Sequence, residues 1–443
     1  MSLGSPISRA LDRTTAWIVR WGGVLPLLAA EFILWTGFGA LLPVMPLYFT
    51  EHGVDIAYLG VVIAAWPAAR LFTEPILGYA ADRTARVPLM VVGLLVAAAS
   101  VGAMVVWASP IAFVALRAAS GLGTAIYDPA ARGYLNDAAP EGRRGEVFGL
   151  YSAAQMGGIL LGPAIGGIGT SIVGSFSFVL MLSALTTLAA AVAVGLRVRE
   201  LPRAAFEGAR RERPGAPGST LAEFPPEMAG SREERPRGAP RPESLQNRFI
   251  AAAILVNLAS YFGGGLYETI WALFVVDRGG SVELIGLTFA VFGLVTIVLS
   301  PYGGRVVDRR GPFPFIVFGI VVMIVMMAGY PFVFDPRLYV AMVALEAVGF
   351  SFLGPATYLV IARGTPEGRS STAQGLTGAA GTVGTIVASL VAGVLAANDL
   401  SAPFLLGAVV ASVLLIITIV VAGRALMTVV PDREAVRAAA AAN

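Results

Sequence analysis

The sequence predicts an all-α membrane protein with about twelve transmembrane helices in two pseudo-symmetric six-helix bundles. Of its 443 residues, 56% are hydrophobic and 13% are charged, and the mean hydropathy is +0.77. Soluble domains carry about 25% charged residues. Apolar runs long enough to cross a bilayer core of about 30 Å as a helix recur along the whole chain. The division into two bundles rests on an internal repeat.

Apolar runs between charged or Pro/Gly breaks give the expected spans. They lie near 23–49, 57–80, 87–107, 111–135, 145–170, 173–196, 249–275, 282–303, 313–333, 338–361, 370–397 and 402–428. The first run is too long for a signal peptide and lacks a small-residue cleavage site, so we expect it to be retained. If the N-terminus is cytoplasmic, 27 of the 31 basic residues, all arginine, lie on or near the cytoplasmic side, the exceptions being Arg70, Arg117, Arg278 and Arg337. This distribution follows the positive-inside rule, so we expect both termini to be cytoplasmic.

A polar segment, 197–248, separates the sixth span from the seventh. It is rich in Arg, Pro, Glu and Gly, and such a composition buries too little apolar surface to offset the entropy of ordering. We interpret it as a flexible cytoplasmic linker. The remaining parts are then a cytoplasmic N-terminal segment, two six-helix bundles and a cytoplasmic tail, at 1–22, 23–196, 249–428 and 429–443.

The two halves match at one constant offset. "DPA" at 128–130 corresponds to "GPA" at 354–356, and "PEGR" occurs at both 140–143 and 366–369. Single residues follow the same spacing of 226: Gly60, Gly78, Asp82 and Arg83 correspond to Gly286, Gly304, Asp308 and Arg309. A tandem repeat of two bundles is typical of transporters in which one half rocks against the other around a central site. Duplication without transport is the alternative.

Several function classes are excluded by composition. The chain has no cysteine, so it has no disulfide, thiolate metal site or cysteine nucleophile. It also has no lysine and therefore no phosphate-binding Walker loop, so we expect no ATP-driven transport through such a loop. The single histidine, His52, stands in a loop without a metal cluster. We expect no cofactor, no metal and no nucleic-acid partner, and the net charge of +3 reflects topology.

Five motifs fall in or next to particular spans. They are "LLPVMPLY" (41–48), "GYAADRTAR" (78–86), "RAASGLG" (117–123), "GGILLGPAIGG" (157–167) and "GGRVVDRRG" (303–311). Together they resemble the major facilitator superfamily, specifically its bacterial drug:proton antiporters with twelve spans. The resemblance covers nearly the whole chain except the linker and the termini. It implies the major facilitator fold, a bacterial inner-membrane location, a small-molecule substrate, a proton gradient as the energy source and a functional monomer.

The motif of the fifth span combines helix-packing and helix-bending residues. Its members are Gly158, Gly162, Pro163, Gly166 and Gly167. Glycines at every fourth position let a neighbouring helix approach closely. Pro163 has no N–H, so it frees the carbonyl one turn earlier and bends the helix. The resemblance implies the antiporter signature, set against the second half as a seam. Helix packing alone is the alternative.

The loops after spans two and eight carry the candidate cytoplasmic gate. Its residues are Gly78, Asp82, Arg83, Arg86, Asp137, Gly304, Asp308 and Arg309. The carboxylate of Asp82 suits a helix N-terminus, whose dipole favours an anion. The resemblance implies that Asp82 holds the halves together in the outward-open state, with Asp137 facing Arg86. An ordinary charged turn is the alternative.

Charged residues within spans are the candidates for proton coupling, because each costs at least about 2.5–3.5 kcal/mol at a helix centre. They are Glu31, Arg117, Asp128, Glu268 and Glu346. Arg117 and Asp128 share a helix face but are ~16 Å apart in height, so we expect no contact. The resemblance implies that Arg117 is the coupling arginine of the fourth span. For Glu74, one turn after Arg70, an ion pair and a functional role both stay open.

Aromatic residues in the spans are candidates to line a substrate cavity. They are Trp35, Trp66, Tyr127, Tyr151, Tyr261, Tyr267 and Trp271. Such rings can stack on a flat cationic compound or bind it through cation–π contact. Packing within the bundles is the alternative for each.

We therefore predict a secondary transporter that exports small lipophilic or cationic compounds against inward proton flow. The first alternative is transport of a specific metabolite such as a sugar, lipid or organic anion. A membrane sensor or scaffold is a further alternative, although a scaffold has no need of gate motifs in both halves. An enzyme is not expected, because the sequence contains no nucleophile–base constellation.

Overall fold

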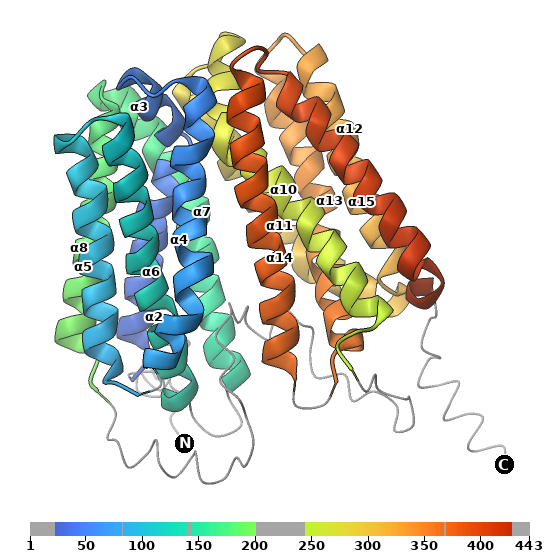
Figure 1. Cartoon of the computed structure of the whole chain (residues 1–443), viewed down its shortest axis with the longest axis horizontal. Coiled ribbons are helices and arrows are strands. Elements are labelled where there is room, and N and C mark those ends of the chain that lie inside the picture. The colour runs from blue at the N-terminus through green and yellow to red at the C-terminus, as the bar shows by residue number, and fades with distance from the viewer. Residues whose placement is uncertain (1–22, 82, 140–143, 201–243, 367–368, 428–443) are drawn as a thin grey trace, which may run out of the picture.

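The computed structural model describes the chain except for residues 1–22, 82, 140–143, 201–243, 367–368 and 428–443. The described residues form helices and no strand, and the helices make two bundles side by side (Figure 1). Eleven of these helices are long and apolar enough to cross a membrane, and one bent pair is a further candidate span. The predicted fold class is confirmed.

The first bundle contains the helices up to Arg197. They are α2 (Leu25–Leu41), α3 (Met45–Glu51), α4 (Ile56–Ala81), α5 (Arg86–Val106), α6 (Pro110–Ala138), α7 (Arg144–Val173) and α8 (Phe176–Arg197). α2 and α3 form the bent pair, with an angle of 49° between them. Pro43 stands in the break and Pro46 in the first turn of α3. Because proline has no N–H and favours the first turn of a helix, "LLPVMPLY" ends one helix and starts the next.

The second bundle begins at Arg248. Its elements are α10 (Arg248–Asp277), α11 (Val282–Arg310), α12 (Phe313–Gly329), the short 3₁₀ helix η1 (Tyr330–Phe332), α13 (Leu338–Gly364), α14 (Ser370–Ala396) and α15 (Ala402–Met427). Asn247 caps α10 by accepting hydrogen bonds from the N–H groups of Phe249 and Ile250. Gly311 directly follows α11 as its C-terminal cap, and its φ of 82° suits a residue without a Cβ.

The spacing of 226 residues holds for whole helices. α4 begins at Ile56 and α11 at Val282, and α8 begins at Phe176 and α15 at Ala402. In the same way α5 corresponds to α12 with η1, α6 to α13 and α7 to α14. The repeat read from short motifs is therefore a repeat of helices.

The two halves contact one another through α4 against α14 and α7 against α11. Each crossing uses a glycine from both helices. A Cβ on Gly393 would lie 2.8 Å from the backbone nitrogen of Gly60, and one on Gly286 would lie 2.6 Å from the carbonyl of Pro163 and 3.3 Å from Gly167 Cα. Gly60 and Gly286 are equivalent in the repeat, and so are Gly167 and Gly393. The interface therefore has its own two-fold pattern.

These crossings lie toward the end of the molecule where α4 and α11 begin and α7 and α14 end, which we call the loop side. At the opposite end, the linker side, α8 stops at Arg197 and α10 starts at Arg248. Figure 1 shows the two bundles close together at the loop side and diverging toward the linker side. The predicted terminal segments 1–22 and 429–443 and most of the predicted linker 197–248 lie outside the described residues.

Candidate functional site

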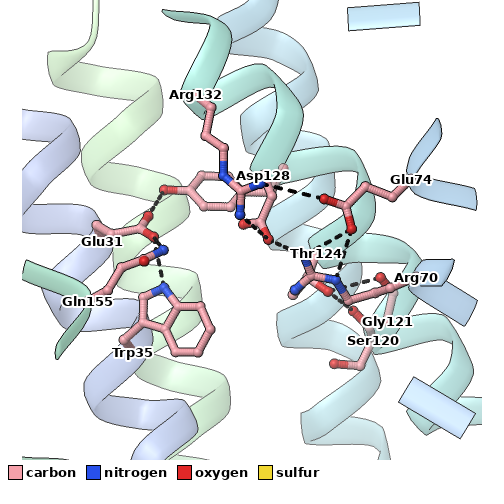
Figure 2. Close-up of polar contacts among 11 residues, drawn as sticks. Glu31, Trp35, Arg70, Glu74, Ser120, Gly121, Thr124, Asp128, Arg132 and Gln155 are labelled. Atoms are coloured by element: carbon pink, nitrogen blue, oxygen red, sulfur yellow. Dashed lines mark hydrogen bonds and ion pairs between the residues drawn. The ribbon is translucent and has the colours of Figure 1, made fainter. Parts of the chain in front are cut away.

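Glu31 of α2 is fully buried and accepts hydrogen bonds from three side chains (Figure 2). Trp35 Nε1 and Gln155 Nε2 donate to Oε1 at 2.8 and 2.6 Å, and the Tyr127 hydroxyl donates to Oε2 at 2.5 Å. No described arginine forms an ion pair with this carboxylate. A hydroxyl can also accept a hydrogen bond, so Tyr127 offers Glu31 a partner in both its charged and its protonated form.

A second cluster joins α4 to α6 beside Glu31. Arg70 Nη2 lies 2.5 Å from Asp128 Oδ2 and 3.1 Å from Glu74 Oε2. Arg132 lies 3.7 Å from Asp128 and 3.8 Å from Glu74. Figure 2 shows Asp128 between Glu31 on one side and Arg70 with Glu74 on the other. The ion pair expected as one alternative for Glu74 is thus present, whereas a functional role for Glu74 stays a prediction. The four charges of the cluster balance.

Arg117 of α6 makes an ion pair with Glu268 of α10, which belongs to the other half. Nη2 lies 3.3 Å from Glu268 Oε1 and also donates to the carbonyl of Ile63 at 3.4 Å. As expected, Arg117 and Asp128 do not form an ion pair with one another; among the described residues, Asp128 pairs with Arg70 and Arg132. This pair joins two helices that are 151 residues apart in sequence.

Glu346 of α13 occupies an aromatic pocket within the second half. Its carboxylate accepts hydrogen bonds from the Tyr267 hydroxyl at 2.7 and 2.9 Å and from the Tyr330 hydroxyl at 2.8 Å. The side chain is buried, and no described arginine forms an ion pair with it. Each half thus holds one buried carboxylate bound by neutral donors, Glu31 in the first and Glu346 in the second.

The aromatic candidates divide between hydrogen-bonding and packing roles. Trp35 and Tyr127 bind Glu31, and Tyr267 binds Glu346. Tyr151 and Trp271 are 2% exposed and belong to hydrophobic cores of the first and second half, respectively. Tyr261 packs against Gly381 of α14. Tyr127, Tyr151 and Trp271 are thus buried side chains, and their role in a substrate cavity stays a prediction.

The glycines of the fifth span face a different neighbour from the one expected. Gly158, Gly162 and Gly166 lie against the backbone of α2, within the first half. Other residues of the motif meet α11 of the second half, among them Leu160, Pro163 through its carbonyl, and Gly167. The prediction that the glycine stripe is set against the second half is therefore wrong. Residues at every fourth position share one helix face, and that face of α7 is directed at α2.

The candidate gate residues lie at the linker side. Arg86 Nη1 is 2.7 Å from Asp137 Oδ2, so the expected contact is present. Arg83 stacks over the Tyr79 ring with Cζ 3.7 Å from its centroid. Gly78 belongs to α4, whereas Gly304, Asp308 and Arg309 belong to α11. Asp82 lies outside the described residues, and the gate role stays a prediction.

Near the candidate gate, Glu200 binds the N-terminus of a helix. Its two carboxylate oxygens accept the N–H groups of Arg86 and Val87, at 3.0 and 2.8 Å, at the start of α5. Sequence reasoning missed Glu200, and it also missed Gln155, Arg132 and Tyr330 as partners of buried charges. Gln155 carried a signal, because it is an amide in an apolar span. Tyr330 carried none, since it stands in the 3₁₀ turn after α12.

Two repeated helix bundles that cross a membrane, with ionisable side chains buried between and within them, define a membrane transporter. A family model described as the Major Facilitator Superfamily matches residues 27–242 and 247–442. The chain therefore belongs to the major facilitator superfamily and is a multi-pass membrane protein.

Curated relatives match only part of the chain. The quinolone resistance protein NorA of Staphylococcus aureus (strain MRSA252) is 27% identical over 136 residues, 31% of this chain and 35% of NorA. The staphyloferrin B transporter of Staphylococcus aureus (strain NCTC 8325 / PS 47) is 31% identical over 176 residues, 39% of this chain and 42% of that protein. The matches thus cover less than half the length of these relatives.

Solved structures share the fold at low identity. The nucleoside transporter NupG has a TM-score of 0.70 at 14% identity, covering 90% of this chain and 98% of that one. A bacterial homolog of the human lysosomal transporter Spinster, in an inward-facing and unoccupied conformation, has a TM-score of 0.67 at 16% identity, covering 91% and 95%. At these identities the likeness concerns the fold alone.

Proposed function

We propose that this transporter is a proton-coupled exporter of small lipophilic or cationic compounds that works by alternating access. The observation that carries the proposal is the pair of buried carboxylates, Glu31 in the first half and Glu346 in the second. Neither carboxylate forms an ion pair with an arginine of the described part of the chain. An ionisable group inside a membrane protein is costly and usually marks a substrate or proton pathway. A carboxylate held by neutral donors can bind and release a proton, which an arginine-paired carboxylate does less readily.

The setting of the proposal is the inner membrane of a bacterium, with the linker side facing the cytoplasm. Its support is the distribution of arginines, which the positive-inside rule places in the cytoplasm. In this orientation the conformation described above is closed at the outer face. We further propose that the monomer is the functional unit and that the proton gradient is the only energy source, with no cofactor. The partial similarity to a quinolone resistance protein agrees with drug export.

The test is transport by purified protein in liposomes with an imposed pH gradient. Ethidium, a planar aromatic cation, serves as the probe, and a protonophore removes the gradient. Glu31→Gln and Glu346→Gln each remove one titratable group at nearly constant volume. We expect each variant to lose gradient-driven accumulation by about tenfold or more while retaining downhill exchange, as expected when a proton carrier is removed.

The matched control is Glu51→Gln, which changes an exposed glutamate at the end of α3 and should transport like the wild type. Full gradient-driven transport by both buried-site variants would contradict the proton-carrier assignment. A gradient that drives no cation at all would contradict the proposal as a whole.

A second candidate function is export of a specific metabolite, favoured by the 31% identity to a staphyloferrin B transporter. Arg117 would then be the expected anion contact. Its charge is already paired with Glu268, so the positive charge is offset before any anion arrives. The same liposomes loaded with a carboxylate-rich metabolite distinguish the two functions by which probe the gradient drives.

A further inference from the structure

The ion pair between Arg117 and Glu268 joins the two halves near the glycine crossings of the loop side. Besides Glu268, Arg117 binds the carbonyl of Ile63, which lies one turn from Gly60 on α4. Gly60 is one of the residues of α4 that contact α14 of the second half. The charge contact and the backbone contact thus act on the same part of the interface.

The ion pair is incomplete on both sides. Its single distance of 3.3 Å is longer than the 2.7–2.9 Å typical of a charged N–H···O bond. Arg117 Nε is buried and has no hydrogen-bond partner among the described residues. The Glu268 side chain keeps 22% exposure, against 3% for Arg117. The Glu268 side chain is therefore partly accessible, and it holds the guanidinium at one point only.

Aromatic rings continue from this ion pair into the first half. The centroid of Trp66 lies 6.0 Å from Arg117 Cζ and 5.4 Å from the Phe38 ring, and Phe38 lies 5.2 Å from Trp35. All three rings are partly exposed. A carboxylate beside a row of aromatic faces is a combination that attracts a flat organic cation, through charge and through cation–π contact.

We propose that Glu268 is the contact for a planar, monovalent organic cation and that the guanidinium of Arg117 occupies this contact when no substrate is bound. A substrate that takes Glu268 displaces Arg117 and removes a charge contact between the halves. The loop side then loses part of what keeps it closed. This inference rests on the proposed export of cationic compounds, because it assigns the substrate contact within that function.

Binding and closure are measured separately. Because the chain has no cysteine, a pair of introduced cysteines forms one defined cross-link. Gly167 of α7 lies against Glu283 of α11 across the interface, and Ser171 stands one turn after Gly167 on α7. A cross-link between Ser171→Cys and Glu283→Cys therefore reports closure of the loop side. Ethidium fluorescence reports binding to protein in nanodiscs. Each cysteine alone is the control for the cross-link.

Arg117→Ala should bind ethidium more tightly by several-fold and should cross-link less in its absence, because no internal cation competes or ties the halves. Glu268→Gln should also cross-link less but bind ethidium about tenfold more weakly, since a charged hydrogen bond is lost. Glu268→Asp should restore part of the binding. In the otherwise unchanged protein, ethidium itself should lower the cross-linking yield. Glu51→Gln should behave like the wild type in both measurements.

Weaker ethidium binding by Arg117→Ala than by the wild type would overturn the inference, and so would a cross-linking yield that ethidium leaves unchanged. Neither outcome depends on a pH gradient. Proton-driven export with unchanged cross-linking would refute this inference and leave the proposed function standing. If binding and cross-linking change as expected but no proton-driven export is seen, the role of Glu268 as a cation contact stands and the proposed proton-coupled export is refuted.

Discussion

Arg70 contacts two carboxylates at once, and the buried charges between α4 and α6 balance because of it. Its Nη2 atom lies within 3.1 Å of both Asp128 and Glu74, and Arg132 adds two longer contacts to the same pair. Buried charges are costly unless paired, and removing one partner leaves the other uncompensated. The cluster therefore depends on its charge balance more than on any one contact.

Arg70→Met should destabilise the protein by about 3 kcal/mol, because two buried carboxylates then face one arginine. Adding Asp128→Asn should recover part of that loss, since it restores the charge balance. The measurement is the thermal unfolding midpoint in detergent. Arg305→Met, which changes an exposed arginine of α11, is the control and should leave the midpoint unchanged. Further destabilisation by the second substitution would contradict the charge-balance argument.

α7 contributes different faces to two interfaces. Gly158, Gly162 and Gly166 allow close approach to α2 within the first half, whereas Gly167 meets α11 of the second half. Contacts within one half are retained when the halves move relative to one another, whereas contacts between halves are made and broken. Glycines that look alike in sequence are thus expected to serve stability in one case and conformational balance in the other.

Gly393→Ala should reduce cross-linking between Ser171→Cys and Glu283→Cys. Its Cβ would lie 2.8 Å from the backbone of Gly60 in the other half, and the halves must separate to accommodate it. Gly162→Ala is the matched variant, with a Cβ 2.5 Å from the Thr36 carbonyl inside the first half. It should instead lower stability by about 1–3 kcal/mol through overpacking. If both variants reduced cross-linking equally, the distinction between glycine contacts within one half and glycine contacts between the halves would be contradicted.

In the described part of the molecule, the two halves cross at the loop side, through α4 with α14 and α7 with α11. The orientation in the membrane decides which face of the transporter is closed. With the linker side in the cytoplasm, the conformation is closed at the outer face. With the opposite orientation, the same coordinates would describe a transporter closed toward the cytoplasm. The distribution of arginines favours the first.

A reporter fused at residue 225 should be cytoplasmic, and one inserted at Gly279, between α10 and α11, should be external. The measurement is the activity of a pair of reporters that work on opposite sides of the membrane. The expected result follows from the excess of arginine on the linker side. The reverse pattern at both sites would invert the assignment of the closed face.

Eleven of the predicted spans and the two-fold repeat could be predicted from the sequence itself, whereas the first span is a bent pair of helices. Most bounds agree to within a few residues, although α11 continues to Arg310, beyond the predicted end at 303. A membrane helix can be recognised from its own segment of sequence, because a backbone in lipid must satisfy its hydrogen bonds within that segment. Glu31, Arg117, Glu268 and Glu346 could be found in the same way, since a charge in an apolar run is visible without any neighbour.

Which residues meet was decided only by the tertiary structure. Arg117 pairs with Glu268 on a helix 151 residues away, and Glu31 is bound by Tyr127 and Gln155 from two other helices. Only the tertiary structure likewise shows that the glycine stripe of α7 packs against α2. Apolar periodicity marks a helix as membrane-spanning but does not tell which neighbour each face meets, because lipid and protein interior are nearly equally apolar.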